Sequence, residues 1–217
     1  MKHAKYKLPT LVMIGVMVLT LVISMSIAVA ATANSLSSSG SNAVTNKLSG
    51  YVTEVGKMNQ ELSKQSIDNV ITTITFSEAL SNATLQEYVE KYDIRIVQLQ
   101  ARGFDADGNR ITFFSRTDKG IDETYRMLNE LAAGDGIDFV GVIGMYALTD
   151  AENIGIIQAD RYTFLADTTG DAFFTGNQST NGIQRNTAKY GDAVSKAFPQ
   201  SVAWDAEELE LVDYSRK

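Results

Sequence analysis

Three oxygen-bearing side chains at alternate positions form the best candidate metal site in the sequence. Asp105, Asp107 and Asn109 stand at positions i, i+2 and i+4, as ligands do at the start of a calcium-binding loop. An EF-hand has glycine at its sixth position and glutamate at its twelfth, whereas the glycine here is at the fourth. An Asp-Gly sequence between two strands is also typical of a hairpin turn. We interpret the segment as a turn and keep the metal site as the alternative.

Histidine and cysteine chemistry is excluded from the part of the chain that would fold. The chain has no cysteine, and its single histidine, His3, lies close to the first residue. A Ser-His-Asp triad, a cysteine nucleophile and a thiolate- or imidazole-bound zinc are therefore ruled out. Paired carboxylates could still act as acid and base. The candidate acids stand where helix caps or polar turns would place them anyway: Asp118, Asp122, Glu123, Asp135 and Asp138. We predict no catalytic residue and no cofactor.

Large aromatic side chains in polar surroundings are the candidates for binding a partner. Phe173 and Phe174 interrupt a stretch rich in Gly, Asn, Thr and Ser, and Trp204 precedes an acidic stretch. Exposed aromatic residues often anchor protein interfaces. The alternative is that these three side chains fix the C-terminal part of the chain to the core.

The hydrophobic segment near the N-terminus predicts export from the cytoplasm. Lys2, Lys5 and Lys7 precede an uncharged run, in which residues 11–31 are long enough to span a bilayer. Small residues at Ala28–Ala30 and Ala31–Ala33 also fit a signal peptidase. Residues 1–33 are thus a signal peptide or a transmembrane anchor. The basic flank places the N-terminus in the cytoplasm and the rest of the chain outside it.

Composition narrows the class of protein further. The net charge is −7, and cleavage after Ala30 would remove three of the 19 basic and none of the 26 acidic residues, leaving −10. Such an acidic chain repels nucleic acid. An exported protein without disulfides must be stabilised by its core, which favours a prokaryotic source.

Residues 34–68 read as a linker followed by a helix. The run from 34 to 42 is rich in Ser and Gly, as flexible linkers are. A helix is expected from about 43 to 65, with an apolar residue every seven positions at Leu48, Val55 and Leu62. This seam predicts either a stalk helix docked on the domain or a short self-associating coil.

Residues 69–167 alternate between strand and helix patterns. Strands are expected at 70–76, 94–104, 110–116, 139–148 and 161–166, and helices at 81–92, 121–133 and 150–158. The strand 94–104 alternates polar and apolar residues, which predicts one buried and one solvent-exposed face with a phase shift near Val97. The element order is β-α-β-β-α-β followed by α-β. The fold class is therefore α/β (α+β), and its first six elements match the ferredoxin-like plan.

Residues 168–217 predict a polar loop and a C-terminal extension. Together these observations favour an exported, non-catalytic module that binds a protein or cell-envelope partner. A carboxylate-dependent hydrolase of cell-surface polymers and a subunit of a surface assembly are the two alternatives.

Overall fold

The computed structural model describes residues 41–170 and 198–215. The chain divides into two compact units, residues 1–49 and residues 50–217, and the division falls within helix α2 (Ser41–Leu62). All contacts discussed below lie within the second unit.

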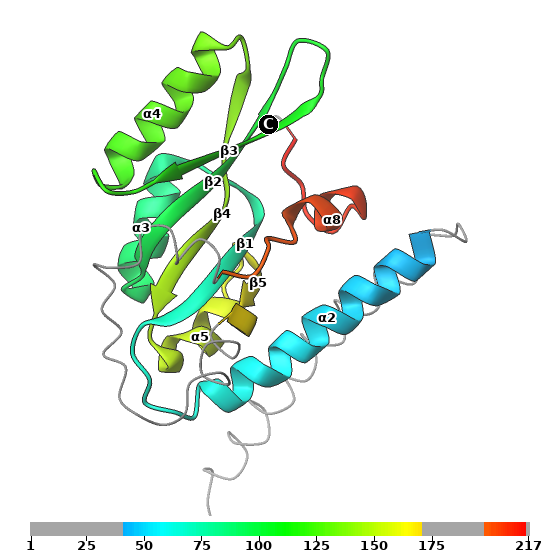
Figure 1. Cartoon of the computed structure of the whole chain (residues 1–217), viewed down its shortest axis with the longest axis vertical. Helices are drawn as coiled ribbons and strands as arrows, with labels where there is room; N and C mark the ends of the chain where they lie inside the picture. Colours follow the sequence, from blue (N-terminus) through cyan, green and yellow to red (C-terminus); the bar gives the residue numbers. More distant parts are fainter. Residues whose placement is uncertain (1–40, 171–197, 216–217) are drawn as a thin grey trace, which may run out of the picture. The chain divides into compact units, whose positions relative to one another are not determined.

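A five-stranded antiparallel sheet with helices forms the described domain, which confirms the α+β class (Figure 1). The strand order is β3-β2-β4-β1-β5. The strands are β1 (Val70–Leu80), β2 (Arg95–Phe104), β3 (Arg110–Arg116), β4 (Asp138–Thr149) and β5 (Thr163–Asp167). The helices after α2 are α3 (Asn82–Tyr92), α4 (Ile121–Gly134), α5 (Ala151–Gln158) and α8 (Ala203–Glu208).

The connections form split βαβ units. Strands β1 and β2 are both antiparallel to β4, which lies between them, and α3 connects them. In the same way β4 and β5 enclose β1 and are connected by α5. The pair β3-α4 stands between β2 and β4 in the chain, and β3 forms one edge of the sheet.

One face of the sheet carries the hydrophobic core. Ile74, Leu99 and Met145 come from three neighbouring strands and are buried against Leu85 of α3 and Leu128 of α4.

The apolar spacing that predicted α3 and α4 is confirmed at Leu85, Tyr88 and Leu128, which face the sheet. It is wrong at Leu131 of α4, which is exposed because the buried stripe of that helix runs through Thr124, Leu128 and Ala132 instead. Ser81 begins α3 as expected, since its side chain accepts a hydrogen bond from the Thr84 amide at 3.2 Å.

The opposite face of the sheet is mainly polar, and part of it is buried. The predicted phase shift in β2 is confirmed by a register shift between Ile96 and Gln98. The expected solvent-exposed face is wrong at Gln100 and Arg102, which are 4% and 0% exposed. Both are buried because residues 198–215 cross this face, on the side opposite the core helices (Figure 1).

The C-terminal segment 198–215 is fixed to the sheet by polar and aromatic contacts. Phe198 stacks on Tyr146 of β4 with ring centroids 5.0 Å apart. The Pro199 carbonyl accepts a hydrogen bond from the Thr73 hydroxyl at 2.9 Å, and the Tyr214 hydroxyl donates to the Phe76 carbonyl at 2.6 Å. The segment is therefore part of the folded domain.

Side-chain amides cap the β5 edge of the sheet. Gln158 donates to the Phe164 carbonyl at 3.2 Å and accepts from the Ala166 amide at 2.9 Å. Asn59 of α2 donates to the Ala166 carbonyl at 2.7 Å. Three backbone groups of an edge strand are thus satisfied as a neighbouring strand would satisfy them, which blocks strand pairing at this edge.

Replacing Gln158 with alanine should therefore destabilise the domain and open this edge. We expect the free energy of unfolding to fall by about 1–3 kcal/mol, because buried backbone groups lose their partners. Chemical denaturation measures the loss, and Gln60→Ala on the exposed side of α2 is the matched control with little effect. Equal stability of the Gln158→Ala and control variants would contradict the capping role.

Candidate binding surface

A fully buried guanidinium organises the polar face of the sheet. Arg102 of β2 donates to the Thr112 hydroxyl of β3 and to the Glu207 carboxylate of α8. Its guanidinium carbon lies 4.6 Å from the ring centroid of Trp204 and 5.9 Å from that of Tyr214. Burial lowers the pKa of Arg102, and the carboxylate of Glu207 opposes that shift.

The buried ion pair therefore fixes α8 over β2 and β3. Glu207 also lies 3.4 Å from Arg110 of β3, so that one carboxylate serves two guanidinium groups. Two polar atoms of this face have no hydrogen-bond partner among the described residues, namely Arg102 Nε and Gln100 Oε1.

Two large aromatic side chains, Trp204 and Phe114, are exposed on the polar face of the sheet. Trp204 contacts two guanidinium groups, with that of Arg110 4.8 Å from its ring centroid, yet it remains 40% exposed. Phe114 lies two residues beyond Thr112 on the same face of β3 and is 50% exposed. We call Phe114, Trp204 and Arg110 the aromatic surface. Its chemistry suits an apolar or aromatic group of a binding partner.

Trp204 both contacts the sheet and remains partly exposed, and its role in binding a partner stays a prediction. One part of the indole is used to attach α8 to the sheet, and the remainder is exposed. Phe173 and Phe174, the other two predicted partner-binding residues, lie outside the described residues.

The acidic turn has the geometry expected of a hairpin. Asp105 Oδ1 accepts hydrogen bonds from the amides of Asp107 at 3.0 Å and Asn109 at 2.7 Å, and Asp105 Oδ2 accepts from Asn109 Nδ2 at 2.8 Å. The bonds from Asn109 are the main reason that the pKa of Asp105 is lowered. Gly108 adopts a φ of 82°, which favours glycine. The carboxylate is used within the turn, and the metal site stays a prediction.

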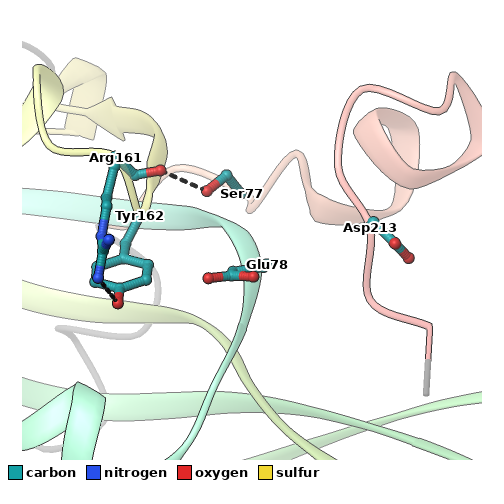
Figure 2. Close-up of a pocket in the computed structure, with 5 residues that line it drawn as sticks. All are labelled: Ser77, Glu78, Arg161, Tyr162 and Asp213. Atoms are coloured by element: carbon teal, nitrogen blue, oxygen red, sulfur yellow. Dashed lines mark hydrogen bonds between the residues drawn. The ribbon is translucent and has the colours of Figure 1, made fainter. Parts of the chain in front are cut away.

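A polar pocket of about 400 Å³ lies where the C-terminal segment meets β1 (Figure 2). Its lining residues are Ser77, Glu78, Arg161, Tyr162 and Asp213. The Ser77 hydroxyl donates to the Arg161 carbonyl at 2.8 Å, and the Arg161 guanidinium stacks on Tyr162.

The two acids of this pocket are not arranged as a catalytic pair. Figure 2 shows Glu78 directed towards Tyr162, whereas Asp213 points away from the other four side chains. A hydrolase would need two carboxylates directed at the same substrate bond. The pocket therefore gives the hydrolase alternative no geometric support.

Three of the acids considered from the sequence have structural partners. Asp122 accepts hydrogen bonds from Asn82 and Gln86, which links α4 to α3. Glu123 pairs with Arg126 at 2.6 Å, and Asp118 lies 3.6 Å from Arg116. These are exposed contacts of the kind that contribute little to stability.

Two residues of the predicted seam in α2 are used within the chain. Val55 is fully buried, and Leu62 packs against Val70 and Ile154. The third residue, Leu48, belongs to the first compact unit. Self-association through the seam stays a prediction, and it would require Val55 and Leu62 to leave these positions.

The predicted export segment belongs to the part of the chain before the first described residue. Residues 11–31 lie outside the described residues. Within the ranges 41–170 and 198–215, no helix has the length and hydrophobicity needed to cross a bilayer.

Sequence reasoning missed Arg102 and Glu207 as the centre of this surface. The signal present was an arginine at an alternating position of β2, which is equally typical of a solvent-exposed face. Its partner follows 105 residues later, and nothing local indicates that the two side chains meet.

Comparison with known proteins gives no relative from which a role could be transferred. The chain matches no family model, no curated protein and no solved structure. A function is therefore inferred from the geometry of the chain itself.

Removing one partner of the buried ion pair should cost more than removing both. Glu207→Leu leaves the Arg102 guanidinium buried without its counter-charge, and we expect a loss of about 3–5 kcal/mol in the free energy of unfolding. The double variant Arg102→Met/Glu207→Leu should recover most of that loss. Urea denaturation of the wild type, the single variants Arg102→Met and Glu207→Leu, and the double variant measures the coupling. Additive losses would contradict the assignment of this pair as a buried, coupled interaction.

The stability of the domain should fall between pH 10 and pH 12 in a way that depends on Tyr51. Burial and the hydrogen bond that Tyr51 donates to Asp167 raise the pKa of Tyr51 to about 12, whereas an unfolded tyrosine titrates near about 10. The neutral phenol is therefore favoured in the folded state. Its contribution to the free energy of unfolding is complete below pH 10 and is lost as the pH rises through 12. When unfolding free energies are measured from pH 8 to 12, the wild type should be more stable than Tyr51→Phe at pH 8, and this difference in stability should decrease as the pH rises. A difference that stays constant with pH would contradict the raised pKa of Tyr51.

Proposed function

We propose that this chain is an exported, non-catalytic extracytoplasmic module whose described domain binds a protein partner. The aromatic surface carries the proposal, because two large side chains remain exposed beside a cluster of arginines. Tryptophan, phenylalanine and arginine are enriched at protein interfaces, and tryptophan and arginine also in their energetic hot spots. A second exposed apolar pair, Met127 and Leu131 of α4, lacks an aromatic residue.

The export part of the proposal is supported by residues 11–31 and the lysines before them. If this segment is retained, the chain is a single-pass membrane protein with its N-terminus in the cytoplasm. If it is cleaved, the domain is secreted. In both cases the domain would reach its partner outside the cytoplasm.

We also propose that the fold is a ferredoxin-like plan with an insertion. The split units β1-α3-β2 and β4-α5-β5 supply the order βαββαβ, and β3-α4 is inserted between them. This assignment differs from the sequence-based one, which used the first four strands and treated the α5-β5 pair as the addition. The insertion contributes β3, and with it Phe114 and Arg110, to the aromatic surface.

Because the chain has no cysteine, single cysteines can test both parts of the proposal in cells that make the full chain. Glu208→Cys places a thiol on α8 next to the aromatic surface and leaves Phe114 and Trp204 in place, and Leu131→Cys is the matched control on α4. A membrane-impermeant maleimide carrying a benzophenone should label both variants on intact cells. After irradiation, only the Glu208→Cys chain should give a discrete adduct with another protein.

Two results would contradict the proposal separately. Labelling that requires cell lysis would contradict export. Adducts from both cysteines, or from neither, would contradict partner binding at the aromatic surface.

A further inference from the structure

The open edge of the sheet lies directly beside the aromatic surface. Strand β3 pairs with β2 on one side, and within the described part of the chain no strand pairs with its other side. The opposite edge of the sheet, β5, is capped by Gln158 and Asn59. Among the described residues, side chains bond to the outer edge of β3 only at its last residue, where the Arg116 carbonyl accepts from the Thr124 hydroxyl at 3.4 Å and the Ser115 hydroxyl at 3.3 Å. An edge strand that is open along the rest of its length can accept a further strand.

The hairpin geometry shows which backbone groups of β3 face outward. The Asp105 amide donates to the Asn109 carbonyl at 3.1 Å, and the Thr117 amide donates to the Val97 carbonyl at 3.4 Å. Hydrogen-bonded and non-hydrogen-bonded pairs alternate along an antiparallel ladder, so the hydrogen-bonded residues of β3 are Ile111, Phe113 and Ser115.

The other residues of β3 therefore direct their amides and carbonyls away from β2. These residues are Arg110, Thr112, Phe114 and Arg116. They are also the residues whose side chains lie on the same face as Trp204. A strand added at this edge would bond to their backbone and place every second side chain beside the aromatic surface.

Charge determines which strand fits. The strand begins with Arg110 and ends with Arg116, and it contains no acidic residue. Antiparallel pairing of β3 with a second copy, in the register that joins all seven residues, would place Arg110 opposite Arg116 twice. Like charges directly opposite each other destabilise a sheet. An added strand with a carboxylate opposite Arg110 and another opposite Arg116 would instead pair opposite charges. Among the residues that the structure describes, the carboxylates nearest these two arginines lie 3.3–3.6 Å away.

We propose that the outer edge of β3 is a strand-addition site that binds an extended segment of a partner protein, apolar at its centre and carrying a carboxylate side chain at each end. The inference rests on the proposed function and specifies the surface and the partner chemistry. Backbone hydrogen bonds would supply much of the affinity, and contacts with Phe114 and the two arginines would supply selectivity.

Hydrogen exchange of the full chain in detergent micelles tests the site with two synthetic peptides. The probe has the sequence Glu-Thr-Val-Thr-Val-Thr-Glu, and its control has lysine in place of both glutamates. Residue-resolved mass spectrometry should show that the glutamate peptide slows exchange at the outward amides of Thr112, Phe114 and Arg116. The lysine peptide should leave these amides unchanged.

Variants separate the backbone and charge contributions. Phe114→Pro removes an outward backbone amide that makes no bond to β2, and an edge strand tolerates proline at such a position. This variant should abolish peptide binding. Phe114→Thr keeps that amide and should retain weaker binding. Arg116→Glu should weaken the glutamate peptide about tenfold, whereas the same charge change at the remote, exposed Lys64 should not.

The outcomes are distinct. Three results would each overturn the strand-addition site. They are the absence of protection at the β3 amides, equal effects of the two peptides, and equal losses of peptide affinity in Arg116→Glu and Lys64→Glu. If the cross-linked adduct of Glu208→Cys nevertheless survives Phe114→Pro, the proposed function stands and this inference fails. If Phe114→Pro abolishes both the adduct and the binding of the peptide, the result supports the proposed function and the strand-addition site.

Discussion

The arrangement of the domain depends on one buried charge, the guanidinium of Arg102. A sheet that is apolar on one face can leave its other face in water, as the alternation of β2 suggests. Here that face is covered, so Arg102 must be compensated within the protein, and Glu207 compensates it from α8. The position of α8 then determines where Trp204 lies, and thereby the composition of the aromatic surface.

The two edges of the sheet are treated differently, and this asymmetry carries the functional argument. At β5, side-chain amides take the place of a neighbouring strand. At β3, arginines at both ends discourage pairing with a second copy but leave the backbone groups of the strand accessible. A protein that only needed to avoid aggregation could have capped both edges. An edge that repels a second copy by its arginines, but can pair with a strand carrying carboxylates, suits a specific partner.

Local patterns predicted most of the fold. The Ser81 cap of α3, the Asp-Gly turn, the order of helices and strands and the irregularity near Val97 all arise from interactions between residues close in the chain, and the structure contains each of them. Asp150 stands at the start of α5 as expected but makes no capping hydrogen bond there. The burial of Gln100 and Arg102 could not be predicted from local patterns. It depends on a C-terminal segment about 100 residues away, whose contacts with the sheet leave no periodic signal. The pairing of Tyr51 with Asp167 was missed for the same reason.

Residues 198–215 form an integral layer of the domain and are held there by Arg102. The chain has one tryptophan, so the fluorescence of Trp204 reports on α8 alone. Denaturant unfolding of the full chain in micelles, followed by this fluorescence and by far-ultraviolet circular dichroism, tests this arrangement most directly. Coincident transitions are expected if α8 and the sheet unfold together. A fluorescence transition at clearly lower denaturant concentration would show that α8 detaches from an intact sheet, and would contradict the account.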